Sequence, residues 1–181
     1  RDSPMSTLTI PTLQTTRLRL EPLSMEHASG MFEMWKHAAV QKYSGPAEDE
    51  HRVPINMPAQ SQSDSDRLIS FWLKAANDGW GFRWAILLNE SDTFIGHIGF
   101  NSLTRCSEIA YHMNPDFWGK GYMSEAANAT IAWQHKEGAA EIEAFIEPEN
   151  AESIALAIRL GLRPTEEHSE GAQRYRMLLP L

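Results

Sequence analysis

Two glycines separated by one residue follow an alternating, strand-like segment and precede a helical one. The alternating segment is Glu108–Met113, and the junction reads Trp118-Gly119-Lys120-Gly121-Tyr122. Because glycine adopts backbone conformations that other residues avoid, the chain can turn sharply here and approach another group closely. The helix that follows presents unpaired N–H groups and the positive end of its dipole. Such a strand–turn–helix unit is suited to binding phosphate, although a glycine pair by itself also fits an ordinary tight turn.

The order of elements along the rest of the chain predicts the fold class. Apolar residues alternate in some segments and recur with helical spacing in others. The predicted order is strand 17–21, helices 24–35 and 64–79, strands 82–88, 93–103 and 108–113, helix 121–137, strand 141–147, helix 150–161 and strands 163–168 and 174–179. An antiparallel meander followed by a strand–helix–strand crossover predicts an α/β (α+β) fold, with a mixed sheet and helices on both faces.

Residues 45–63 fit neither pattern. This stretch is rich in Pro, Ser, Gln and acidic residues. Irregular stretches of this length are uncommon inside a compact domain, and they are usually either mobile binding loops or disordered segments. The sequence leaves both alternatives open.

Length, charge and cysteine content limit the function classes. A chain of 181 residues suffices for one domain, so we expect an N-terminal tail over 1–14 and a single domain over 15–181. Residues 1–4 precede Met5 and are interpreted as a remnant of expression. A formal net charge of −8 without Lys or Arg clusters argues against nucleic-acid binding. The apolar runs are too short to span a bilayer, and a single cysteine, Cys106, fits a reducing compartment, so we expect a cytoplasmic protein.

Several short motifs spread along the chain match one known pattern. They are Glu108-Ile109-Ala110-Tyr111, Pro115–Tyr122, Ser124-Glu125-Ala126 and Glu149-Asn150-x-x-Ser153 through Leu160-Gly161-Leu162. Together they resemble the GNAT superfamily of N-acetyltransferases. Thr15–Leu20 and Ile95–Phe100 look most similar to its ribosomal-protein N-terminal (alanine/serine) acetyltransferase-like branch, so the resemblance covers residues 15–179. It implies a mostly antiparallel seven-stranded sheet whose central parallel strand pair splays apart to admit the cofactor.

The resemblance implies acetyl-coenzyme A as the acetyl donor. Its pyrophosphate is expected against the turn formed by Trp118, Gly119, Lys120, Gly121, Tyr122, Met123 and Ser124. The backbone of Tyr111, His112 and Met113 is expected to pair with the pantetheine arm as a neighbouring strand would. Asn150 is expected to bind the pantetheine chain, and Ser153 to face the sulfur. The chain departs from the family's pattern at Asp116, where Gln or Arg is usual, so this acid must point away from the phosphates.

Acetyl transfer to an amine needs a group that accepts a proton and a group that protonates the leaving thiolate. Glu108 is the predicted base, acting directly or through water, and His112 on the same strand face is the second candidate. Ser153 or water is the predicted acid, because no tyrosine lies between Ile142 and Gly161, whereas much of the superfamily uses a tyrosine for this role. Simpler alternatives stay open: Glu108 as an exposed strand-end residue, and Ser153 as part of a helix cap.

We therefore predict an N-acetyltransferase that moves an acetyl group from acetyl-coenzyme A directly to a primary amine, without a metal. The acceptor is a protein N-terminus or a small-molecule amine, and the residues do not decide between these two. The alternative is a catalytically silent coenzyme-A-binding module that acts as a sensor or partner protein. Neither nucleic acid nor membrane is an expected partner, and the sequence leaves a homodimer open.

Overall fold

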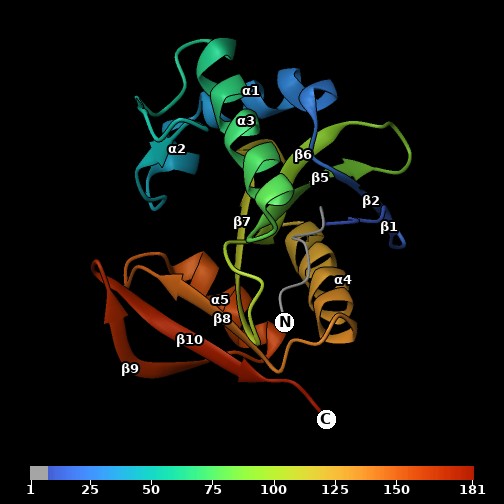
Figure 1. Ribbon diagram of the computed structural model, residues 1–181, viewed down its shortest axis with the longest axis vertical. Coiled ribbons are helices and arrows are strands. Elements are labelled where there is room, and N and C mark those ends of the chain that lie inside the picture. The colour runs from blue at the N-terminus through green and yellow to red at the C-terminus, as the bar shows by residue number, and fades with distance from the viewer. Residues whose placement is uncertain (1–7) are drawn as a thin grey trace, which may run out of the picture.

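The centre of the fold is a strand without an exposed residue. β5 (Phe82–Leu88) is buried along its whole length and lies between β2 (Leu18–Pro22) and β6 (Phe94–Phe100). The computed structural model in Figure 1 describes residues 8–181. A strand that is buried on both faces requires cover on both sides of the sheet. The helices provide it.

One eight-stranded sheet contains all the long strands, in the order β1-β2-β5-β6-β7-β8-β10-β9. The remaining members are β1 (Leu13–Gln14), β7 (Cys106–Met113), β8 (Glu141–Ile146), β9 (Arg163–Ser169) and β10 (Ala172–Leu178). Neighbouring strands are antiparallel, except for the parallel pair β7 and β8. The mixed, mostly antiparallel sheet is confirmed. Its eighth strand, β1, was not predicted, because a two-residue strand leaves no periodic signal.

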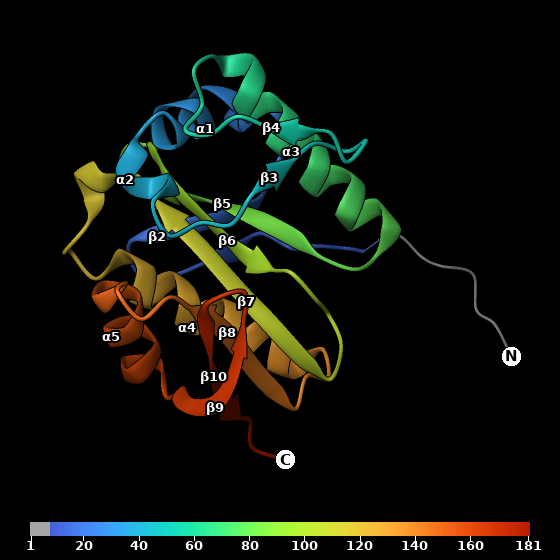
Figure 2. The ribbon, with the colours of Figure 1, turned by 90° about the vertical axis from the view of Figure 1, so that its left-hand side faces the viewer.

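Within the described part of the chain, five α-helices cover the sheet in two groups (Figures 1 and 2). They are α1 (Ala28–Trp35), α2 (Ala38–Gln41), α3 (Gln62–Asp78), α4 (Tyr122–Lys136) and α5 (Ala151–Leu160). Apolar residues of α1 and α3 pack with Ala85 and Leu87 in one core. Those of α4 and α5 pack with Trp84 and Ile86 in another. Successive side chains of a strand point to opposite faces of the sheet, so alternate residues of β5 pack into the two cores.

The segment 45–63 forms a small hairpin, which neither alternative from the sequence describes. β3 (Ala47–Glu48) pairs with β4 (Pro54–Ile55). The carboxylate of Asp49 accepts hydrogen bonds from the backbone N–H groups of His51 and Val53, and it forms an ion pair with Arg67 of α3 at 2.8 Å. A turn closed by an Asp side chain and bound to a helix is an ordered connection.

Several boundaries differ from those predicted, among them the starts of α3 and β10. α3 begins at Gln62 after Ser61, earlier than a cap at Asp64 or Ser65 would give, because the Asp64 carboxylate instead accepts from the backbone N–H of Gln60 at 3.0 Å. The last strand, β10, begins at Ala172 rather than at residue 174. A local hydrogen bond accounts for the start of α3, and pairing of Ala172 with Ser169 of β9 accounts for the start of β10.

The predicted N-terminal tail is partly attached to the domain. Leu8, Ile10 and Leu13 pack against the larger core, and the indole N–H of Trp84 donates to the carbonyl of Pro11 at 2.8 Å. The predicted remnant, residues 1–4, lies outside the described residues. Within residues 8–181, no helix has both the length and the apolar character that crossing a membrane requires.

Candidate active site

The glycine turn lies where β7 ends and α4 begins. A short 3-10 helix, Pro115–Phe117, leaves β7, and the side chain of Asn114 caps it by accepting from the backbone N–H of Asp116 at 3.0 Å. The indole N–H of Trp118 donates to the carbonyl of Met113 at 2.8 Å and anchors the turn to the strand. Asp116 is exposed. The predicted strand–turn–helix unit is therefore present.

Both glycines have left-handed backbone conformations. Gly119 has a φ of 75° and Gly121 a φ of 80°, a region that L side chains rarely adopt. A Cβ at Gly119 would meet no atom within 4 Å, so the space above this residue is open. Gly121 is the N-cap of α4 and no side chain caps the helix there. The first N–H groups of α4 are thus free to bind an anion.

Arg17, near the start of the chain, binds the glycine turn. Its Nη1 donates to the carbonyl of Lys120 at 3.0 Å, and its Nε pairs with the Glu125 carboxylate at 2.7 Å. The same carboxylate accepts from the hydroxyl of Thr15 at 2.6 Å. Burial raises the pKa of Glu125, but these hydrogen bonds together outweigh burial and lower it. Ionised at neutral pH, Glu125 therefore binds Thr15 and Arg17 and fixes the first turn of α4 beside the start of β2.

Two further cations lie by this turn. Lys120, between the glycines, is exposed, and Arg159 of α5 donates to the hydroxyl of Ser124 at 3.3 Å. Since Arg17 is already paired with Glu125, Lys120 and Arg159 are the cations that remain near the open end of α4. Positive charge beside unpaired N–H groups favours a phosphate ligand.

The parallel strand pair separates within the site. β7 and β8 are paired only from Cys106 opposite Glu141 to Glu108 opposite Glu143. From Ile109 to Met113, β7 pairs with β6 on one side and not with β8 on the other. On the side that faces β8, the backbone N–H and C=O groups of this part of β7 are not paired with that strand, so a ligand can bind them as a further strand would. The predicted splaying is confirmed.

Glu108 is the last residue of β7 that pairs with β8. It is half-buried, and its Oε2 accepts from Nδ2 of Asn101 at 2.8 Å. Burial raises the pKa of its carboxyl and the neighbouring Glu143 adds to this, whereas the Asn101 hydrogen bond and the charge of Arg83 oppose it. A carboxylate whose pKa is moved toward neutrality is better matched to proton transfer than an exposed one.

His112 forms a pair with His97 on the neighbouring strand. The His97 Nε2 and the His112 Nδ1 are 2.9 Å apart, and the indole of Trp35 packs on both rings. Burial, aided by the charge of Arg83, lowers the pKa of His112 to about 3. A base must accept a proton, and the protonated form of His112 is unfavourable here. His112 is therefore less suited than Glu108 to the predicted role of base.

Tyr111 and Ser153 meet beside the separated strands. The two hydroxyl oxygens are 2.7 Å apart and link β7 to the first turn of α5. The side chain of Asn150 caps that turn by accepting from the backbone N–H of Ser153 at 3.3 Å. Burial raises the pKa of Tyr111, while the Ser153 hydrogen bond and the charge of Arg159 oppose the shift, so this phenol stays protonated at neutral pH. The structure thus adds the hydroxyl of Tyr111 to the site, whereas the sequence predicted a role for its backbone alone.

Comparison with known proteins decides the family. A family model described as an acetyltransferase (GNAT) domain matches residues 17–163, most of the chain. The chain belongs to the GNAT acetyltransferase family. An uncharacterized N-acetyltransferase, p20, from Bacillus licheniformis is 31% identical over 149 residues, which cover 80% of this chain and 78% of p20. A GNAT domain with N-acetyltransferase relatives makes this chain an acyltransferase.

Solved GNAT structures share the fold. An acetyltransferase from Agrobacterium tumefaciens is 24% identical, with a TM-score of 0.75 and coverage of 99% of each chain. RimL, a ribosomal alpha-N-protein acetyltransferase in complex with coenzyme A, is 17% identical, with a TM-score of 0.74 and coverage of 93% of this chain and 98% of that chain. At these identities the likeness shows the fold of this GNAT acetyltransferase and not its acceptor.

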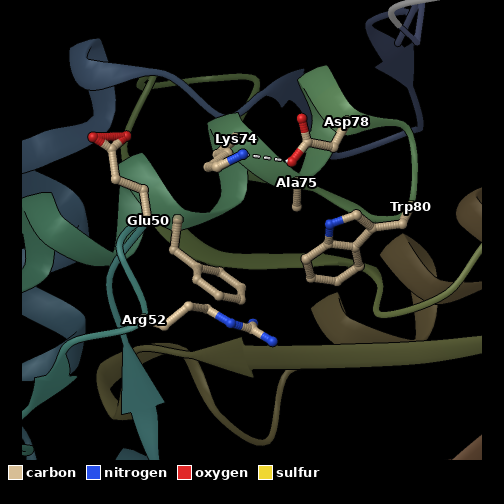
Figure 3. Close-up of a pocket in the computed structure, with 7 residues that line it drawn as sticks. Glu50, Arg52, Lys74, Ala75, Asp78 and Trp80 are labelled. Atoms are coloured by element: carbon tan, nitrogen blue, oxygen red, sulfur yellow. Dashed lines mark hydrogen bonds and ion pairs between the residues drawn. The ribbon is translucent and has the colours of Figure 1, made fainter. Parts of the chain in front are cut away.

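This GNAT acetyltransferase has a separate hollow between α3 and the 45–63 hairpin (Figure 3). It has a volume of about 540 Å³, and its lining residues are Glu50, Arg52, Phe71, Lys74, Ala75, Asp78 and Trp80. Phe71 and Trp80 pack edge to face, and both rings contact Trp72. The surface beside α3 therefore has a hollow, lined by aromatic and charged side chains, of the volume typical of small-molecule sites.

Sequence reasoning missed three polar residues of the site. Arg17 stabilises the glycine turn, and Asn101 and Arg83 connect to Glu108. Arg17 and Arg83 each alternate with apolar residues, the pattern of an ordinary strand residue facing solvent. No local signal distinguishes them, because their partners lie far away along the chain.

Proposed function

We propose that this protein transfers the acetyl group of acetyl-coenzyme A directly to a primary amine, with Glu108 as the base. The observation that carries the proposal is the position of Glu108. It is the last paired residue before β7 separates from β8, on the strand that leads into the glycine turn. A cofactor bound along β7 would therefore lie beside the Glu108 carboxylate, whose pKa is raised by burial.

The described residues fit acetyl-coenzyme A. The open N-terminus of α4 and the turn from Trp118 to Ser124 suit the pyrophosphate, with Lys120 as a neighbouring cation. The unpaired edge of β7 from Tyr111 to Met113 suits the pantetheine arm. Asn150 and Ser153 at the start of α5 suit the end of that arm. Coenzyme A in the similarly folded RimL supports this assignment.

The chemistry then follows from the positions of the polar groups. Glu108 accepts a proton from the acceptor nitrogen, directly or through water, and the nitrogen forms a bond to the thioester carbonyl carbon. The carbon–sulfur bond breaks, and the thiolate takes a proton from the hydroxyl pair of Ser153 and Tyr111. The amide and the free thiol are the products.

An α-amine suits this base better than a lysine side chain. A free α-amino group has a pKa of about 7.7 to 8.0, against about 10.4 for lysine, so it gives up its proton more readily to a carboxylate. We therefore propose a protein N-terminus or a small molecule with an amine of low pKa as acceptor. We also propose a cytoplasmic location and a single domain over residues 15–181.

Thiol release from acetyl-coenzyme A tests the proposal across N-terminal peptides, lysine peptides and small amines. Glu108→Gln should slow single-turnover transfer about 100-fold while leaving coenzyme A affinity nearly unchanged. The control is Glu90→Gln, the same change at an exposed residue in the turn between β5 and β6. Tight cofactor binding without release for any amine would instead indicate a silent coenzyme-A-binding module. Binding no tighter than that of inorganic phosphate would contradict both functions.

A further inference from the structure

Arg83 is a buried cation close to the site, and it contacts no carboxylate of residues 8–181 directly. Its side chain is 5% exposed. Its Nη1 donates to the carbonyl of Phe82 at 3.1 Å and its Nη2 to Oδ1 of Asn101 at 2.7 Å, while its Nε has no partner among residues 8–181. The guanidinium stacks on the indole of Trp72, 3.6 Å from the ring centre. Burying an incompletely paired charge is unfavourable, and an apolar side chain of similar size would stabilise the fold more.

Asn101 connects this cation to Glu108. The backbone N–H of Asn101 donates to the carbonyl of Glu108 at 2.8 Å. This backbone hydrogen bond keeps the two residues adjacent independently of their side-chain conformations. The side-chain Oδ1 accepts from Arg83, and Nδ2 donates to the Glu108 carboxylate at 2.8 Å. A guanidinium has donors only, so it accepts just one orientation of the amide. That orientation directs the NH₂ group, also a donor, toward Glu108.

We propose that Arg83 is the positioning residue of this site: it fixes the orientation of the Asn101 amide, so that Asn101 donates to Glu108 and keeps this carboxylate ionised. Without Arg83 the amide is free to rotate. Its oxygen would then face Glu108 and accept a hydrogen bond from the protonated acid. The proposal rests on the proposed function, in which Glu108 acts as the base.

The charges around Glu108 are consistent with this role. Glu143, opposite Glu108 on β8, raises the pKa of Glu108, although its own charge is paired with Arg174 of β10 at 2.6 Å. Burial lowers the pKa of Arg83 to about 9, so the guanidinium is still charged at neutral pH. Its charge lowers the pKa of Glu108 and those of His97 and His112. One cation thus favours an ionised carboxylate and neutral imidazoles together.

Carbon-13 NMR of glutamate-labelled protein measures the ionisation of Glu108 without any assay of activity. Loss of one carboxyl signal in Glu108→Gln assigns it. Arg83→Met and Asn101→Leu should each raise the titration midpoint by about one pH unit. Arg19→Met, on neighbouring β2, is the matched control and should leave the midpoint unchanged. An unchanged midpoint in either Arg83→Met or Asn101→Leu would overturn the proposal.

The double variant separates action through Asn101 from direct action through space. If Arg83 acts through the amide, Arg83→Met should add little to the shift already caused by Asn101→Leu. A full additional shift would overturn the relay. Should Arg83→Met fail to fold, Arg83→Gln replaces it. Glutamine has no charge, and its amide can present either a donor or an acceptor to Asn101, so it does not impose one orientation on that amide. A raised midpoint in Arg83→Gln supports the proposal, and an unchanged midpoint contradicts it.

The pH profile of single-turnover transfer distinguishes failure of this inference from failure of the proposed function. With both correct, the acid limb of the profile moves to higher pH together with the NMR midpoint, whereas loss of fold alone would lower the rate at every pH. If the midpoint rises and the acid limb does not move, the positioning role of Arg83 stands and Glu108 is not the base. If neither moves, the positioning role is wrong.

Discussion

Acidification should destabilise this acetyltransferase through the buried histidine pair. The pKa of His112 is lowered from 6.5 to about 3 by burial and by the charge of Arg83. The unfolded chain therefore binds this proton first as the pH falls, and the free energy of unfolding decreases below pH 6.5. Over the roughly 1.5 pH units between pH 6.5 and pH 5, the unfolded chain binds the proton of His112 and the folded protein does not. His112 alone should therefore remove about 2 kcal/mol of stability at pH 5 relative to pH 7.5.

Urea unfolding followed by tryptophan fluorescence at pH 7.5, 6 and 5 measures this loss. The variant His112→Gln lacks the titrating group. Between pH 7.5 and pH 5, the free energy of unfolding of this variant should therefore fall by about 2 kcal/mol less than that of the parent. His51→Gln is the control, because this side chain is 77% exposed and should leave the parent's pH dependence unchanged. Equal losses in the parent and in His112→Gln would refute the assignment.

Three further changes have defined outcomes. Gly121→Val should weaken coenzyme A binding in calorimetry, because a β-branched residue disfavours a φ of 80°; unchanged affinity would argue against the turn as the phosphate site. Ser153→Ala should slow single-turnover transfer less than removal of the base does, since the Tyr111 hydroxyl remains, and an equal loss would make Ser153 the dominant group. Gly99→Ala should lower stability in thermal melts by about 3 kcal/mol or more, because a Cβ there would lie 2.0 Å from the carbonyl oxygen of Phe82; a stable variant would show that β5 and β6 can separate.

The sequence predicted the elements that depend on local pattern. The glycine turn, the start of α4 just after Gly121 and the ends of α3 and α5 near Gly79 and Gly161 all follow from glycines beside a periodic segment. The two-residue strands β1, β3 and β4 were missed, because they are too short to show a period. What makes them strands is pairing with a distant segment.

The same distinction divides the site. Glu108, His112 and Ser153 were singled out because motifs surround them, and their catalytic roles remain predictions. Arg83 lies in no motif, and the resemblance of Thr15–Leu20 to the family gave Arg17 no role in the site. Arg17 contacts a residue 108 positions away in the sequence, and Arg83 reaches Asn101 across 18 positions.

What the sequence alone determined is therefore the resemblance to GNAT proteins, the order of elements and the turn suited to phosphate, because each depends on short motifs or on local periodicity. Only the tertiary structure decided which charges are buried and what they face. It placed Arg83 by Asn101, His97 by His112 and Tyr111 by Ser153. The physical reason is that burial and hydrogen bonding set the protonation state of a side chain, and both depend on neighbours that the folded sheet brings together.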